Sequence, residues 1–275
     1  MPFSRAGACI TMAGIYMALR FAVPWVKLGG INPHLAIFLS VAVLMLAQLA
    51  LVVSIAGLQM RPRHAMLLAL PSAVIVAAII VLEAKLAAGV PPPEVVLAVS
   101  SALRDLCLIL FAASLGYALS FIIRERNILV PAAVFAALVD YWSVSWGPLS
   151  RVLEEKPEIA AAASVQMPTP VAGEPGTMIG IGDFVFLALF FGALYRFGMN
   201  VKGAFWFGYG LLTVCMLVVS THGGALPALV PISIAVIGAN VRNFKLRREE
   251  LLAIVYVGAL LLIALITSGI FLFWR

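Results

Sequence analysis

The feature that most constrains this chain is a series of long apolar segments separated by short polar connections. A helix of about 20 mostly apolar residues crosses a bilayer, and it satisfies its own backbone hydrogen bonds, which hydrocarbon cannot do. Segments of this kind lie at 6–26, 35–57, 65–83, 102–123, 128–147, 179–199, 203–221, 224–240 and 251–273. The sequence therefore predicts an all-α, polytopic transmembrane helix bundle with about nine spans.

Composition excludes the soluble alternatives. Apolar residues make up 64% of the 275 residues and charged residues 11%, whereas soluble domains carry about 45–50% and about 25%. The net charge of +6 therefore does not indicate a soluble nucleic-acid binder. Cys9, Cys107 and Cys215 lie in apolar segments and lack the spacing of a metal site or a disulfide framework. We expect the lipid bilayer as a partner, and no nucleic acid, cofactor or metal.

The predicted spans form one integral-membrane domain, 1–275, with N-terminal helices over 1–127, a core over 128–240 and an extra C-terminal helix at 251–273. The connection 148–178 interrupts the core, and its density of Pro and Gly predicts a mobile loop. By span parity, eleven Lys and Arg residues lie on the side of the N-terminus and six on the other. Because the side richer in Lys and Arg faces the cytoplasm, we expect a cytoplasmic N-terminus. We further expect a multi-pass protein of a prokaryotic cell membrane.

Two of the twelve acidic residues, Asp140 and Asp183, lie well inside predicted spans. A carboxyl at membrane depth costs about 2.5–3.5 kcal/mol even on the most lenient insertion scale, so such residues suggest a function. From the rise of a helix, they lie roughly 10 and 6 Å below the same surface on consecutive antiparallel helices. We expect the two carboxyls to meet, although each could instead cap backbone groups or bind an Arg. Other acids near span ends are interpreted as boundary ion pairs, namely Asp105 with Arg104 and Glu83 near Lys85.

Two neighbouring carboxyls share one proton, because both cannot ionise cheaply. Aspartic proteases use this arrangement. One carboxylate takes a proton from water, the water attacks a peptide carbonyl, and the other carboxyl donates a hydrogen bond to the developing oxyanion. The sequence has no HExxH or GxSxG motif that would favour another hydrolase mechanism. A buried acid pair beside a proline-broken helix is also typical of a proton- or cation-coupled transporter or channel, although the chain has no internal repeat.

Two further motifs are predicted at the same depth. Asp183 ends the tetrad Gly180-Ile181-Gly182-Asp183, whose glycines would let another backbone approach closely. The segment 224–240 begins with Leu226-Pro227-Ala228-Leu229, and Pro227 and Pro231 disturb helix geometry. A proline kink would explain this segment alone. Broken backbone at membrane depth is tolerated only where it is buried in protein or lines a cavity, so the three elements together favour a site.

These motifs resemble those of presenilin and the signal peptide peptidases, a family of GxGD-type intramembrane aspartyl proteases. Gly180 to Phe184 is similar to the GxGD motif, Leu226 to Leu229 to the PAL motif, and 147–154 to the stretch after the first catalytic aspartate. The resemblance covers about 128–240. It implies catalytic roles for Asp140 and Asp183 and cleavage of peptide bonds in or near spanning segments of a transmembrane protein or peptide. It further implies supporting roles for Gly180, Gly182 and Tyr141, and substrate binding by Leu226, Pro227, Ala228 and Leu229.

The chain departs from the family pattern in two ways. The family usually has Tyr before its first aspartate, whereas Val139 precedes Asp140 here and Tyr141 follows it. The aspartates also fall on predicted spans five and six rather than six and seven, with the PAL motif on span eight rather than nine.

A helical substrate must unwind before cleavage, and an extended strand can pair with enzyme backbone. We expect that pairing at Pro227 to Leu229 or at the end of the loop 148–178.

Overall fold

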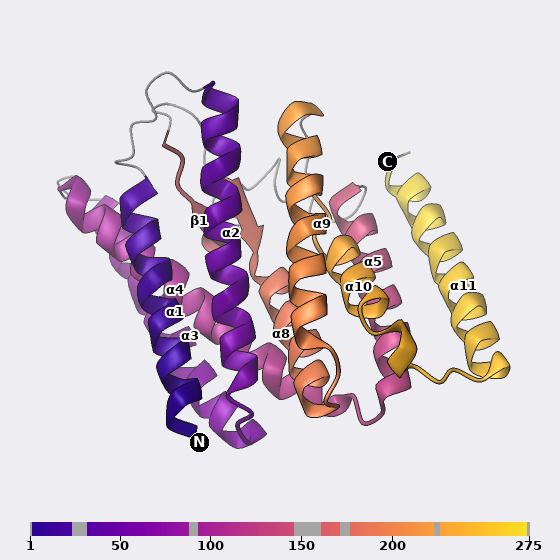
Figure 1. Ribbon diagram of the computed structural model, residues 1–275. Helices are drawn as coiled ribbons and strands as arrows, with labels where there is room; N and C mark the ends of the chain where they lie inside the picture. Colours follow the sequence, from indigo (N-terminus) through magenta and orange to yellow (C-terminus); the bar gives the residue numbers. More distant parts are fainter. Residues whose placement is uncertain are drawn as a thin grey trace. The chain divides into compact units, whose positions relative to one another are not determined.

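The computed structural model describes residues 2–23, 32–87, 93–145, 161–170, 177–222 and 226–273. Within these ranges the chain forms nine α-helices, one for each apolar segment predicted from the sequence (Figure 1). In chain order they are α1 (Pro2–Ala22), α2 (Pro33–Gly57), α3 (Pro62–Ala87), α4 (Glu94–Leu119), α5 (Leu129–Ser145), α8 (Ile181–Arg196), α9 (Val201–His222), α10 (Leu229–Gly238) and α11 (Arg248–Phe273). The predicted all-α class is therefore confirmed.

Several of these helices are long and apolar enough to cross a membrane, which indicates a membrane-spanning protein. Among the described residues there are five such stretches: Pro33–Gly57, Pro62–Glu83, Val95–Ile122, Arg126–Ser145 and Val201–Val218. Helix α8 has 16 residues and α10 only 10, fewer than the 20 or so that a complete span needs. The count of nine complete spans therefore stays a prediction.

The first of two compact units comprises 1–119 and 161–192. It contains α1 to α4, two short strands and most of α8. Within it α3 packs on α4, α1 packs on α2, and α4 also contacts both α1 and α2. Its core is apolar and fully buried, with Leu44, Leu51, Ile55 and Ile109 at 0% exposure.

The second unit comprises 120–160 and 193–275. It contains the 3-10 turns η2 (Ser120–Ile122), η3 (Arg126–Ile128) and η4 (Val241–Asn243), together with α5, the last turn of α8, α9, α10 and α11. Helix α10 contacts both α5 and α9, and α11 packs on α5. This division differs from the predicted grouping into 1–127, 128–240 and 251–273, because the segment 161–192 packs with the N-terminal helices.

Part of the predicted loop 148–178 forms a hairpin. Strand β1 (Ser164–Met167) pairs antiparallel with β2 (Thr177–Gly180), with Ser164 opposite Gly180. Val165 and Met167 are almost fully buried, and β1 packs on α4. Burial of these two side chains explains why β1 is ordered despite the prolines that follow it. Residues 148–160 and 171–176 lie outside the described part of the chain.

Local signals set three helix limits near the candidate site. Helix α4 begins at Glu94 directly after Pro93, and the Val96 N–H bonds the Pro93 carbonyl at 2.9 Å, so α4 starts well before the predicted 102. Helix α10 begins at Leu229, later than the predicted 224. After α8 the chain turns at Gly198, whose φ of 62° lies in the left-handed region that favours glycine.

Candidate active site

Asp140 lies on α5 and is hydrogen-bonded to the start of α10. Its Oδ2 accepts the backbone N–H of Leu229 at 2.9 Å. Further along the same interface, the Ser233 hydroxyl donates to the Ala133 carbonyl at 2.9 Å. The two bonds show that α5 and α10 run antiparallel, and they fix the depth at which Leu229 meets Asp140. The structure therefore brings the first predicted catalytic residue into contact with the LPAL segment.

The Asp140 carboxylate acts as a cap for α10. The first backbone N–H groups of a helix lack partners inside the helix, and the N-cap residue of α10 supplies no side-chain hydrogen bond. Leu229 bonds Asp140, Val230 bonds the Pro227 carbonyl at 3.2 Å, and Pro231 has no N–H. Pro227 and Pro231 thus lie before α10 and in its first turn, where no intrahelical N–H donor is needed. The predicted break is therefore the N-terminus of a helix, capped by the Asp140 carboxylate.

Asp183 lies where the hairpin turns into α8. Strand β2 ends at Gly180, α8 begins at Ile181, and the acid is in the first turn of the helix. The Ile181 N–H bonds the Ala163 carbonyl at 3.1 Å, which extends the ladder into the helix. Asp183 is half-buried, and Gly180 and Gly182 are exposed. The ladder therefore holds this carboxyl at a fixed position relative to the strands.

The two glycines of the GxGD tetrad leave space beside Asp183. A Cβ built on Gly182 would meet nothing within 4 Å among the described residues, and one on Gly180 would lie 3.7 Å from Asp183 Oδ2. The expected close approach of another backbone is therefore not made by any described part of the chain. It occurs instead two residues after Asp183, where a Cβ on Gly116 of α4 would overlap the Val185 carbonyl oxygen. Sequence reasoning missed Gly116, although a small residue in a spanning helix is a packing signal.

The structure gives the burial of the remaining predicted site residues, but it does not test whether Asp140 and Asp183 meet. Leu226, Pro227 and Ala228 are half-buried next to the Asp140 contact, whereas the Tyr141 side chain is 46% exposed. Asp140 belongs to the second unit and Asp183 to the first, so the meeting of the two carboxyls stays a prediction. The stretch 147–154, which carries part of the family resemblance, lies outside the described residues.

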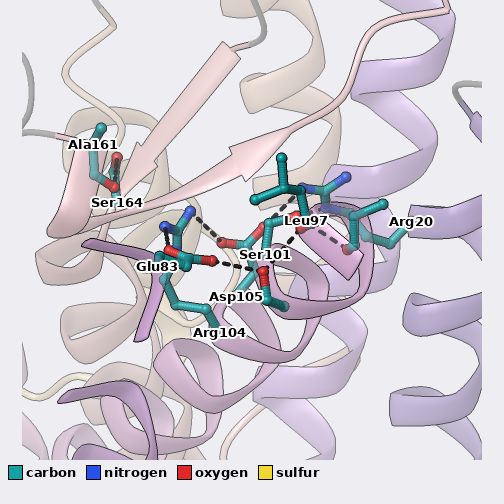
Figure 2. Close-up of polar contacts among 10 residues, drawn as sticks. Arg20, Glu83, Leu97, Ser101, Arg104, Asp105, Ala161 and Ser164 are labelled. Atoms are coloured by element: carbon teal, nitrogen blue, oxygen red, sulfur yellow. Dashed lines mark hydrogen bonds and ion pairs between the residues drawn. The ribbon is translucent and has the colours of Figure 1, made fainter. Parts of the chain in front are cut away.

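A second group of charged residues was predicted only in part from the sequence. The predicted ion pair of Asp105 with Arg104 is present, but Asp105 is not at the start of its helix: it lies eleven residues after Glu94, about 16 Å along α4, and is 0% exposed. It accepts both Nε and Nη2 of Arg20 at 3.2 Å, and Arg104 Nη2 lies 3.8 Å from its other oxygen. Figure 2 shows this row of ion pairs. The boundary interpretation failed because α4 begins earlier than predicted and because Arg20 is 85 residues away in sequence.

Glu83 belongs to the same group. Its Oε2 lies 2.7 Å from Arg104 Nη1, and its Oε1 accepts the Ser100 hydroxyl at 2.9 Å. It was expected near Lys85 at an interface, but its observed partners are on α4. We call Arg20, Glu83, Arg104 and Asp105 the α4 charge cluster; it contains two positive and two negative groups.

No family model, curated protein or solved structure matches this chain. Among the described residues, no group of three or more His, Cys, Asp or Glu side chains could hold a metal ion.

Proposed function

We propose that this protein is an intramembrane aspartyl protease of the presenilin type, with Asp140 and Asp183 as its catalytic pair. The observation that carries the proposal is the 2.9 Å bond from the Leu229 backbone to Asp140. Two motifs that are 89 residues apart, and that stand out in the sequence for different reasons, are in direct contact.

The surroundings of Asp183 support the same reaction. A hydrolytic site needs room for a peptide and a water near the reacting carboxyl, and a Cβ on Gly182, the residue before Asp183, would meet no described residue within 4 Å. One carboxylate removes a proton from water as the oxygen attacks the peptide carbonyl. The other carboxylic acid donates a hydrogen bond to the oxyanion, and a proton then passes to the leaving nitrogen. No side-chain nucleophile is required.

The hairpin offers a place for an extended substrate. The Ile181 N–H bonds the Ala163 carbonyl, so these two residues form a hydrogen-bonded pair of the ladder. In an antiparallel ladder, hydrogen-bonded pairs alternate with pairs whose backbone groups point away from the partner strand. The backbone groups of Met178 and Gly180 therefore point away from β1. In the described part of the chain the sheet has only two strands, so this edge of β2 is open to another strand. Main-chain pairing of that kind is an established mode of peptide recognition.

The test uses purified full-length protein in lipid nanodiscs with single-span transmembrane substrates. Wild type is compared with Asp183→Ala, and the products are identified by mass spectrometry. We expect discrete internal cuts with wild type and none with the variant. Equal product from both proteins would refute the catalytic pair.

The competing function is a proton- or cation-coupled carrier. The same nanodisc preparation tests it with a peptide inhibitor that carries a hydroxyl isostere of the tetrahedral intermediate. A protease binds this inhibitor tightly because it resembles the transition state, whereas a carrier has no reason to. Absence of both cleavage and inhibitor binding, together with proton flux in vesicles, would establish the carrier instead.

A further inference from the structure

The α4 charge cluster requires an explanation beyond helix packing. Asp105 is fully buried, and Arg104 is 9% exposed. Removing charges from water costs several kcal/mol per ion, and buried ion pairs often stabilise a fold no better than apolar residues would. At membrane depth, ionisable residues suggest a functional role. The cluster also lies outside the catalytic pair, so the proposed reaction makes no direct use of it.

The geometry of the hairpin directs one strand edge at this cluster. Gln166 lies opposite Met178 in the ladder. The two residues form a non-hydrogen-bonded pair, so the backbone N–H and C=O of each point away from the partner strand. The Gln166 backbone N–H therefore points out of β1, on the side opposite β2. There it lies on the side of the Asp105 carboxylate, in agreement with the packing of β1 on α4. Figure 2 shows a strand of the hairpin passing beside Asp105.

A continuous set of contacts within the first unit then leads from Asp105 to Asp183. Arg20 holds the Asp105 carboxylate through two bonds of 3.2 Å, and the carboxylate faces the backbone of β1 at Gln166. Strand β1 pairs with β2, and β2 passes into the first turn of α8. Only the residues 181 and 182 separate β2 from Asp183. A displacement of β1 would therefore move the candidate catalytic carboxyl.

We propose that Asp105 is a positioning residue: held by Arg20, it anchors the hairpin at Gln166 and thereby sets the position of Asp183. The inference rests on the proposed proteolytic function. Asp105 itself touches no reacting atom. The buried charge is retained because the ionised carboxylate receives two charge-assisted bonds from the Arg20 guanidinium at Oδ2, and a neutral amide in its place would hold Arg20 more weakly.

The test compares Asp105→Asn with Glu83→Gln in full-length protein in nanodiscs. Both substitutions neutralise an acid paired with an Arg of the cluster, but only Asp105 faces the hairpin. We expect Asp105→Asn to lower kcat about 10- to 100-fold, because a misplacement of about 1 Å can cost that much, with KM within about threefold. Glu83→Gln should keep kcat within about threefold of wild type. In parallel, hydrogen exchange read by mass spectrometry should show faster exchange of 161–170 and 177–183 in Asp105→Asn only.

A third variant keeps the test decisive if Asp105→Asn does not fold. The pair Arg20→Gln with Asp105→Asn leaves no unpaired charge at this contact, and it should show the same loss of kcat and of hairpin protection. Wild-type kcat and hairpin protection in the folded Asp105 variants would overturn the proposal, as would an equal loss in Glu83→Gln. If wild type and Asp183→Ala are both inactive, the proposed function fails, while hydrogen exchange still decides whether Asp105 anchors the hairpin.

Discussion

Asp140 has two separable roles, as a cap for α10 and as a proposed acid or base, and two substitutions distinguish them. Asp140→Asn keeps an oxygen that can accept the Leu229 N–H, whose nitrogen lies 2.9 Å from Oδ2 in the wild type, but an amide cannot act as a general base or acid toward water. Asp140→Ala removes both functions. Since Asn and Asp cap helices about equally well and Ala costs about 0.5–2 kcal/mol, we expect Asp140→Ala to be about 1 kcal/mol less stable than Asp140→Asn.

Activity should respond differently from stability. Loss of one acid–base group lowers catalysis by about 10²–10⁴-fold, so both Asp140 variants should lose cleavage equally. Stability is measured by denaturant unfolding in mixed micelles and cleavage by mass spectrometry on the same preparations. Cleavage retained by Asp140→Asn would refute the catalytic role. Equal stability of the two variants would refute the capping role, whatever their activity.

Two further substitutions test the position of Asp183 and the open edge of β2. Gly116→Ala should destabilise the first unit by about 1–3 kcal/mol in thermal unfolding through overpacking, because a Cβ there overlaps the Val185 carbonyl. Gly14→Ala is the control that should show no such loss, because a Cβ on Gly14 would meet no described residue within 4 Å. Met178→Pro removes a backbone donor that faces away from β1, so it should raise KM about tenfold, the equivalent of about 1.4 kcal/mol of lost substrate pairing, while hydrogen exchange of β1 stays unchanged. An unchanged KM would mean that the substrate does not pair with this edge.

The sequence alone determined the helices and drew attention to Asp140. A bilayer requires every backbone group of a segment to be satisfied within that segment, so apolar length is a local signal and each of the nine segments forms a helix. Asp140 and the LPAL segment both stand out in the residues alone, because a charge or a proline in an apolar segment is conspicuous. The predicted N-terminal limits of α4 and α10 were less accurate. Both helices begin where Pro93 and Leu229 make capping hydrogen bonds, and hydropathy does not report such bonds.

Only the tertiary structure decided which groups meet. The Asp140–Leu229 bond, the Arg20–Asp105 bonds and the Gly116–Val185 approach each join residues far apart in sequence. Such pairings depend on how helices pack, and apolar faces toward lipid and toward protein look alike in sequence, since lipid tails are as apolar as the side chains. The hairpin beside Asp183 was hidden for a related reason. Its strands are four residues each, too short to show a periodicity. They are fixed by their pairing with each other and by the packing of β1 on α4.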